Sequence, residues 1–213
     1  MTDQHSTLRA QRRAETRRAI QAHAVRLFTD RGYDATTVTD VARAAGVSPM
    51  TVYRHFPTKE DLVLVDRRAE LVAERVAASS VELPLVHRVG GALVASAAAM
   101  TGGGGDAPSA DERFLLARLR LMISTSALRA KHLDNDYALQ QAIVTALGTE
   151  AVDPADPEAE FRAQAAIGAC LAAMHAALMR WAADDGETEL PGLIAKALAA
   201  AFGQDVTEPA PEM

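Results

Sequence analysis

Apolar residues recur along the chain at intervals of about one helical turn, and this pattern predicts helices. The first stripe consists of Ile20, Ala24, Leu27 and Phe28. It predicts a helix over residues 10–31, which Gly32 should end. Long runs that alternate polar with β-branched residues, the pattern of half-buried strands, are absent. We therefore expect an all-α fold.

Two short helices joined by a glycine are predicted next. Thr37 and Asp40 match a capping box, which predicts a helix beginning directly after Thr37. Gly46 should end this helix, because glycine tolerates the positive φ of a helix stop. Ser48 suits an N-cap, and the proline after it suits the first position of a further helix over Pro49–His55.

The remaining chain repeats these signals, for a total of about nine helices. The expected helices lie at residues 58–78, 84–100, 111–125, 136–147, 158–183 and 190–202. Only a weaker helical piece is expected between 125 and 136. Irregular segments are expected at residues 1–9, 102–108, 153–157 and 206–213.

The distribution of charge changes the meaning of the net charge of −6. Residues 1–56 hold nine Arg against five acidic residues, a local balance of +4. The rest of the chain has a balance of −10. A basic segment attracts phosphates, whereas an acidic body keeps the rest of the protein soluble and off DNA.

Two short helices joined at Gly46 match a helix-turn-helix, whose second helix enters the major groove of DNA. Val41, Val47, Val52 and Phe56 are spaced to hold the two helices together. The second helix should expose Met50, Thr51, Tyr53, Arg54 and His55. Threonine can contact base edges and arginine can bind guanine with two hydrogen bonds. The alternative is that the two helices are plain architecture.

Five short motifs in residues 15–65 together resemble the N-terminal domain of the tetracycline-repressor (TetR) family. They are Phe28–Tyr33 (FTDRGY), Thr36–Val38 (TTV), Val41–Ser48 (VARAAGVS), Thr51–Phe56 (TVYRHF) and Lys59–Leu62 (KEDL). The resemblance implies a three-helix DNA-binding domain, taken as residues 10–57. It also implies a homodimer and a divergent C-terminal domain, taken as residues 58–205, which binds a small effector and dimerises.

The resemblance also implies which residues contact DNA. Family positions that contact phosphates or bases are occupied by Thr37, Arg43, Ser48, Thr51, Tyr53, His55 and Lys59. Pro49, Met50 and Arg54 complete the predicted DNA-binding set. Pro49 and Met50 replace the common pairing of a small or polar residue with Gly. Met50 has two readings, in which it packs on a thymine methyl or lies on the sugar-phosphate backbone.

An arginine-rich arm precedes the motif. It contains Arg9, Arg12, Arg13, Arg17 and Arg18. One reading is a solvated basic tail, and the other is an arm that reaches into a neighbouring minor groove.

The helix expected over 158–183 is apolar on nearly every face after Ala163, so it should be buried all round. One side would pack on its own domain and the other on a partner subunit, with the helix at 190–202 completing a four-helix interface. Gln164, His175 and Arg180 argue against a membrane span. His175 is interpreted as a core or interface histidine.

The effector-binding residues can only be proposed from residue type and helical position. The proposed pocket residues are Phe114, Arg118, Met122, Tyr137, Met174 and Trp181. The alternative for the apolar ones, which the sequence favours, is that they are ordinary core residues. Arg118 is read as a surface residue or as an anchor for an acidic group of the effector. A small hydrophobic or amphipathic effector fits these residues.

Other functions find little support. The chain has no GxSxG, HExxH, CxxC or GxxxxGK[ST] motif, so we expect no enzyme. The six histidines are scattered, so no metal site and no cofactor are expected. The single cysteine, Cys170, and the lack of an apolar leader predict a cytoplasmic protein. A helical small-molecule-binding or scaffold protein without a DNA role remains the alternative.

Overall fold

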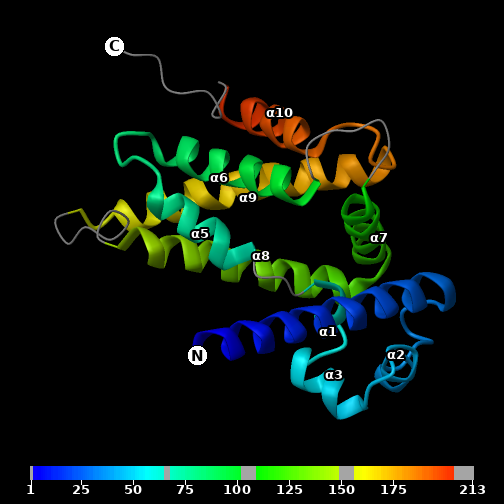
Figure 1. Cartoon of the computed structure of the whole chain (residues 1–213). Coiled ribbons are helices and arrows are strands. Elements are labelled where there is room, and N and C mark those ends of the chain that lie inside the picture. The colour runs from blue at the N-terminus through cyan, green and yellow to red at the C-terminus, as the bar shows by residue number, and fades with distance from the viewer. Residues whose placement is uncertain (1, 65–67, 102–108, 149–155, 204–213) are drawn as a thin grey trace. The chain divides into compact units, whose positions relative to one another are not determined.

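In a computed structural model of the chain, residues 2–64, 68–101, 109–148 and 156–203 are described. These residues form ten helices and no strand (Figure 1), which confirms the predicted all-α fold. The helices are α1 (Thr2–Arg31), α2 (Val38–Ala44), α3 (Pro49–His55), α4 (Asp61–Leu64), α5 (Arg68–Ala78), α6 (Leu85–Thr101), α7 (Ala110–Ser124), α8 (Ser126–Leu147), α9 (Ala159–Ala183) and α10 (Leu190–Phe202).

The chain divides into two compact units. The first unit comprises Met1–Val65 and Arg120–Lys131, and the second unit comprises Asp66–Leu119 and His132–Met213. In the first unit α1 packs on α2 and α4, and α2 packs on α3. The predicted domain boundary lies after residue 57, before α4. The first compact unit also includes α4 and residues 120–131.

The core of the first unit is aromatic and aliphatic. Val41 and Val52 are fully buried, and Phe56 is buried beside them, as the predicted contact between the two short helices requires. The rings of Phe28 and Tyr33 lie 5.0 Å apart at a tilt of 53°. Such tilted pairs stabilise a core by about 0.5–1.5 kcal/mol beyond the area that they bury.

The second unit is organised around α9, which packs on α6 and α10. Its buried residues follow one broad face and include Ile167, Cys170 and Trp181. Burial raises the pKa of the Cys170 thiol to about 12, so this cysteine is an unreactive core residue. Within the single chain α9 is therefore buried on one face, and burial of the other face by a partner subunit stays a prediction.

By length and composition, α9 is also the one helix among the described residues that could cross a membrane. Core helices of soluble proteins satisfy the same criterion. The buried face of α9 and the polar Gln164, His175 and Arg180 fit a core helix better.

Two predicted boundaries are wrong. Residues 2–9 are helical, because no glycine or proline interrupts the chain before Gly32. The weaker piece before residue 136 is a regular part of α8, in which Leu128 is fully buried. The predicted loop at 102–108, residues 153–155 of the predicted linker, the tail at 206–213 and residues 65–67 within the predicted helix 58–78 lie outside the described residues.

Candidate nucleic-acid interface

The turn between α2 and α3 is a regular helix stop. Gly46 has a φ of +66°, the left-handed conformation that favours glycine. The Val47 amide donates to the Ala42 carbonyl at 3.0 Å, and the Gly46 amide donates to the Arg43 carbonyl at 3.3 Å. These two bonds define a Schellman motif, which satisfies the last carbonyls of α2. The turn therefore fixes the direction in which α3 leaves.

The start of α2 has the predicted capping box. The Asp40 amide donates to Thr37 Oγ1 at 3.2 Å, and the Thr37 amide donates to Asp40 Oδ2 at 3.0 Å. Hydrogen bonds from the side chain and backbone of Thr37 hold the pKa of the Asp40 carboxyl below its usual value. Both bonds favour the charged carboxylate near a helix N-terminus, where negative charge is stabilising.

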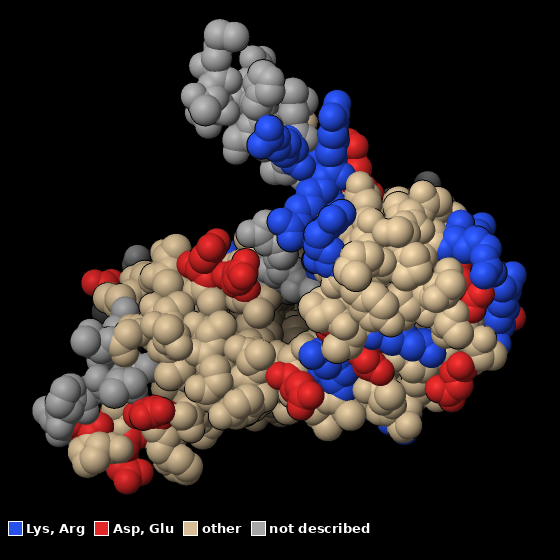
Figure 2. Space-filling view, turned by 90° about the horizontal axis from the view of Figure 1, so that it is seen from below, with Lys and Arg blue, Asp and Glu red and all other residues tan. Residues whose placement is uncertain are grey.

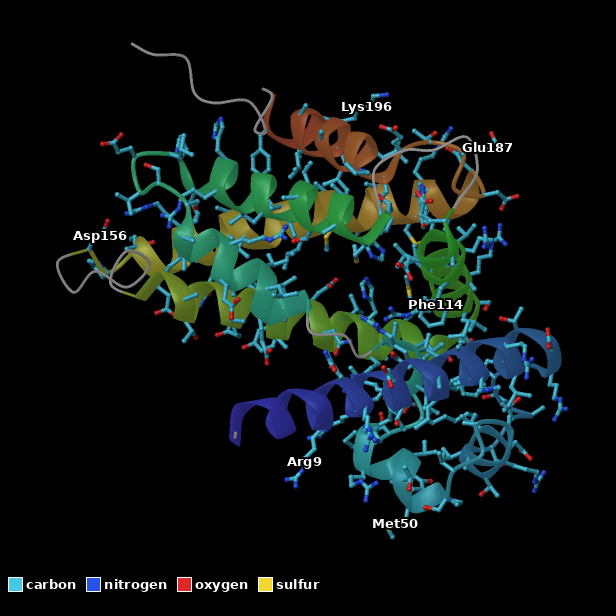
Figure 3. The ribbon with its side chains drawn as sticks, in the orientation of Figure 1. Arg9, Met50, Phe114, Asp156, Glu187 and Lys196 are labelled. Carbon is cyan, nitrogen blue, oxygen red and sulfur yellow. The ribbon has the colours of Figure 1, made fainter. Side chains whose placement is uncertain are left out.

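The start of α3 is equally well defined. Ser48 Oγ accepts a hydrogen bond from the Thr51 amide at 3.1 Å, and Pro49 occupies the first turn. Val52 is buried, whereas Met50 is 74% exposed and Tyr53 is 50% exposed. Figure 3 shows Met50 at the tip of α3, pointing away from the rest of the first unit. The helix thus presents one face to solvent and anchors the other.

The basic residues of this surface differ in how exposed their side chains are. Arg54 is exposed, and Arg43 is exposed with only a surface ion pair to Asp40 at 3.3 Å, which stabilises little. His55 is half-buried, and burial together with the nearby Arg13, Arg54 and Arg17 lowers its pKa.

Lys59 is engaged in the fold of the first unit. Its Nζ donates to the Tyr33 carbonyl at 2.6 Å and lies 4.1 Å from the centre of the Tyr33 ring. The Tyr33 hydroxyl donates to Glu60 Oε1 at 2.8 Å, and burial followed by this bond raises the pKa of Tyr33. The phosphate contact of Lys59 stays a prediction, because these contacts give the ammonium a structural role of its own.

The arginine-rich arm is part of α1. Arg9, Arg12, Arg13 and Arg18 are exposed on this helix. Figure 2 shows Lys and Arg side chains gathered along the projecting helix, and in Figure 3 Arg9 points to the same side as Met50. Arg17 differs, because its guanidinium lies 4.7 Å from the Phe56 ring centre and donates to the His55 carbonyl at 3.3 Å.

Two family models match this chain. One, described as bacterial regulatory proteins of the tetR family, matches residues 20–65. The other, described as an MftR C-terminal domain, matches residues 97–203, which is half of the chain. The chain belongs to the TetR family. This membership confirms the predicted family of helix-turn-helix transcription regulators, which are not enzymes.

Individual relatives match over short segments. The HTH-type transcriptional regulator TcmR of Streptomyces glaucescens is 40% identical over 57 residues, which are 27% of this chain and 25% of the relative. The HTH-type transcriptional repressor KstR2 of Rhodococcus jostii is 50% identical over 40 residues, 19% of this chain and 20% of the relative. These matches thus span a quarter or less of the relatives' length.

A TetR-family fold is also found in solved structures. A TetR-family regulator from Streptomyces coelicolor A3 has a TM-score of 0.54 and 20% sequence identity, covering 92% of this chain and 96% of that chain. At this identity the likeness concerns the fold alone.

The residues predicted to form an effector pocket are dispersed. Met122 belongs to the first unit, whereas Phe114, Arg118, Tyr137, Met174 and Trp181 belong to the second. The Arg118 guanidinium lies 5.7 Å from the Phe114 ring centre. Trp181 is buried, whereas Tyr137 is 65% exposed. This set therefore stays a prediction.

The structure also brings together three residues that the sequence left scattered. His132, Asp136 and His175 offer ligand-type atoms that lie within 4.8 Å of one another. The expectation that the histidines lie apart is wrong for these two. The spacing of His132 and Asp136, one helical turn apart, was the available signal.

Proposed function

We propose that this TetR-family chain is a ligand-responsive transcriptional repressor. It binds palindromic operator DNA as a homodimer and is released by a small hydrophobic or amphipathic effector. The observation that carries the proposal is the geometry of α3, which is held by buried Val52 and exposes Met50 and Tyr53. A short helix with one anchored face and one exposed face suits the major groove.

The proposed division of labour follows from the chemistry of the side chains. Thr51 and Arg54 contact base edges, with Arg54 suited to guanine. Met50 packs on a thymine methyl or on the backbone, and Pro49 sets the start of the helix. Phosphates are contacted by Thr37, Arg43, Ser48, Tyr53, His55 and Lys59. Hydroxyls and cations at helix starts are typical phosphate ligands.

The exposed face of α9 is the surface that we propose for contact with a second copy of the chain. Small residues form a stripe along it, namely Ala165, Ala169, Ala172 and Ala176. These alanines are exposed in the single chain and lie opposite the buried face. Because small side chains let two helices approach closely, we propose that α9 pairs across a two-fold axis, with α10 beside it.

The effector would bind the second unit in the cytoplasm. The face that carries Phe114 and Arg118 combines an aromatic ring with a cation, which suits an amphipathic acid. A coupling of about 1–3 kcal/mol between effector and operator changes DNA affinity by roughly 5–150-fold, which is enough for induction.

The proposal is tested by fluorescence anisotropy with DNA from upstream of the protein's own gene. We expect salt-dependent binding, and Arg54→Ala should weaken specific binding by about 1–3 kcal/mol. Arg113→Ala, an exposed change in the second unit, is the matched control and should leave affinity unchanged. No binding to any such DNA at low salt would refute the operator function.

A further inference from the structure

In the second unit, the part of α8 from His132 onward lies against α9, and the two helices are antiparallel. The Gln140 side-chain amide donates to the Gln164 carbonyl at 2.8 Å. Further along, His132 Nε2 lies 3.0 Å from His175 Nδ1. Because positions increase along α8 as they decrease along α9, the two helices run in opposite directions. This contact places one histidine from each helix face to face.

A carboxylate completes the contact. Asp136 lies one turn after His132 on the same face of α8, and its Oδ2 is 3.5 Å from His132 Nε2. The two imidazole rings are stacked with their centres 5.1 Å apart. Three donor atoms, two nitrogens and one oxygen, therefore converge from two helices.

The spacing of these donors matches that around a small cation. Ligands at about 2.0–2.1 Å in a tetrahedral site lie about 3.3 Å from each other. The two separations from His132 Nε2, 3.0 Å to His175 Nδ1 and 3.5 Å to Asp136 Oδ2, bracket this value. All three donors lie within 4.8 Å of one another, so an ion needs only small side-chain movements to bind all of them.

The donor set also selects the class of ion. Imidazole nitrogens suit Zn²⁺, Ni²⁺ and Co²⁺, whereas Mg²⁺ and Ca²⁺ prefer a shell made entirely of oxygens. Two histidines and one carboxylate leave a further coordination position open, as in zinc sites that accept a water or another ligand.

We propose that His132, Asp136 and His175 form a binding site for one divalent transition-metal ion of the zinc type, which links α8 to α9. The side chains of His132 and Asp136 are 15% and 23% exposed, so the site is sheltered and still open to ions. A cation there offsets the cost of burying a carboxylate. The competing arrangement is a metal-free hydrogen-bonded trio, in which one imidazole N–H donates to its neighbour.

Cobalt titration of the tag-free protein tests the site, because Co²⁺ reports its coordination by visible absorption. We expect a ligand-field spectrum that saturates at one ion per chain and is displaced by Zn²⁺. His132→Ala, His175→Ala and Asp136→Asn should each weaken binding at least about tenfold, since even changes outside the ligand shell cost 10–100-fold in metal affinity. Zn²⁺ should also raise the Tm of the wild type, and EDTA should reverse the rise.

His23→Ala is the matched control, because His23 lies on α1 in the first unit beside Arg26, whereas the three ligands belong to the second unit. It should leave the spectrum and affinity unchanged. A wild-type protein without a ligand-field spectrum overturns the site, as does a spectrum retained when both histidines are replaced. Circular dichroism checks that the variants fold; where an alanine variant does not, Asp136→Asn and the wild-type spectrum decide. No DNA is needed, so this result is independent of the regulatory function.

Discussion

Among single residues, Gly46 has a clear energetic role, because its φ of +66° lies where other residues are strained. A Cβ at this position would have nothing within 4 Å, so Gly46→Ala tests backbone strain alone. We expect a loss of about 1 kcal/mol in the free energy of unfolding, measured by urea denaturation. The tilt of α3 depends on the same turn, so operator affinity should fall as well.

Gly91→Ala is the control for this change. Gly91 also has nothing within 4 Å of an added Cβ, but it lies inside α6 without a positive φ. Alanine should stabilise the protein there by about 0.5–1 kcal/mol, because glycine is a poor helix former. Equal effects at both positions would contradict the role assigned to the turn.

His55 should make DNA binding depend on pH. Burial and then the surrounding Arg13, Arg54 and Arg17 lower its pKa below the usual 6.5 in the free protein. Phosphates would neutralise these arginines and raise the pKa in the complex. The complex then takes up a proton in the window around and below pH 6.5, so affinity should increase as the pH falls from 8 to 6, as measured by anisotropy.

His55→Gln should remove this pH dependence, whereas His23→Gln should retain it. The same lowered pKa acts oppositely on folding. Its contribution to stability is present above pH 6.5 and is lost as the pH falls through the lowered pKa, because the unfolded chain binds the proton first. A His55→Gln variant with the wild-type pH profile of DNA binding would exclude His55 from the phosphate contacts.

The sequence predicted local chemistry at single positions well and tertiary partners poorly. The caps at Thr37 and Ser48 need only residues three positions away, and both are present. Lys59 was assigned from its family position, yet its ammonium meets the carbonyl of Tyr33, 26 positions earlier. Such a contact depends on how α1 packs on the following helices, which local spacing does not encode.

At the scale of elements, α1 combines a buried apolar stripe with an exposed basic arm, and the two roles can be tested separately. Its apolar stripe, including fully buried Ile20 and Ala24, builds the core, while its early arginines are exposed. If the arm contacts DNA, Arg12→Gln with Arg13→Gln should reduce the slope of log K against log salt by about 0.9 for each phosphate lost. The slope is measured by anisotropy between roughly 50 and 200 mM salt, a range over which phosphate contacts change the affinity strongly.

The control changes the same charge elsewhere. Arg75 and Arg113 are exposed in the second unit, so Arg75→Gln with Arg113→Gln should leave the slope unaltered. An unchanged slope in the Arg12 and Arg13 variant would mean that the arm is a solvated tail. Arg17 is unsuited to this test, because its guanidinium also packs on Phe56.

Element boundaries were predictable where a stop signal exists. The predicted end at residue 31 and the helix at Pro49–His55 agree with α1 and α3, which are bounded by Gly32 and Ser48. The apolar periodicity predicted only a weak helix over residues 126–135, whereas the structure has a continuous helix there with Leu128 fully buried. The contact between His132 and His175 could not be predicted from local spacing either, because the two residues lie 43 positions apart on two helices.

At the scale of the whole molecule, the uneven charge matches the division of labour proposed for a TetR-family repressor. Residues 1–56 carry +4 and the remainder −10, so phosphate attraction is concentrated where α3 and the arm lie. The acidic remainder would repel DNA, which favours approach through the first unit. A single α3 reads few base pairs, so useful affinity requires two copies of the unit on one operator.

The proposed dimer interface on α9 can be tested by a single substitution. Ala172 lies in the exposed alanine stripe of α9, so Ala172→Glu would place two like charges in a closely packed two-fold interface. We expect the wild type to be a dimer at micromolar concentration by light scattering and the variant to be a monomer with much weaker operator binding. Ala98→Glu makes the same exchange at an exposed position of α6 and should remain dimeric. A monomeric wild type would contradict the dimer, and a dimeric Ala172→Glu variant would place the interface elsewhere on the second unit.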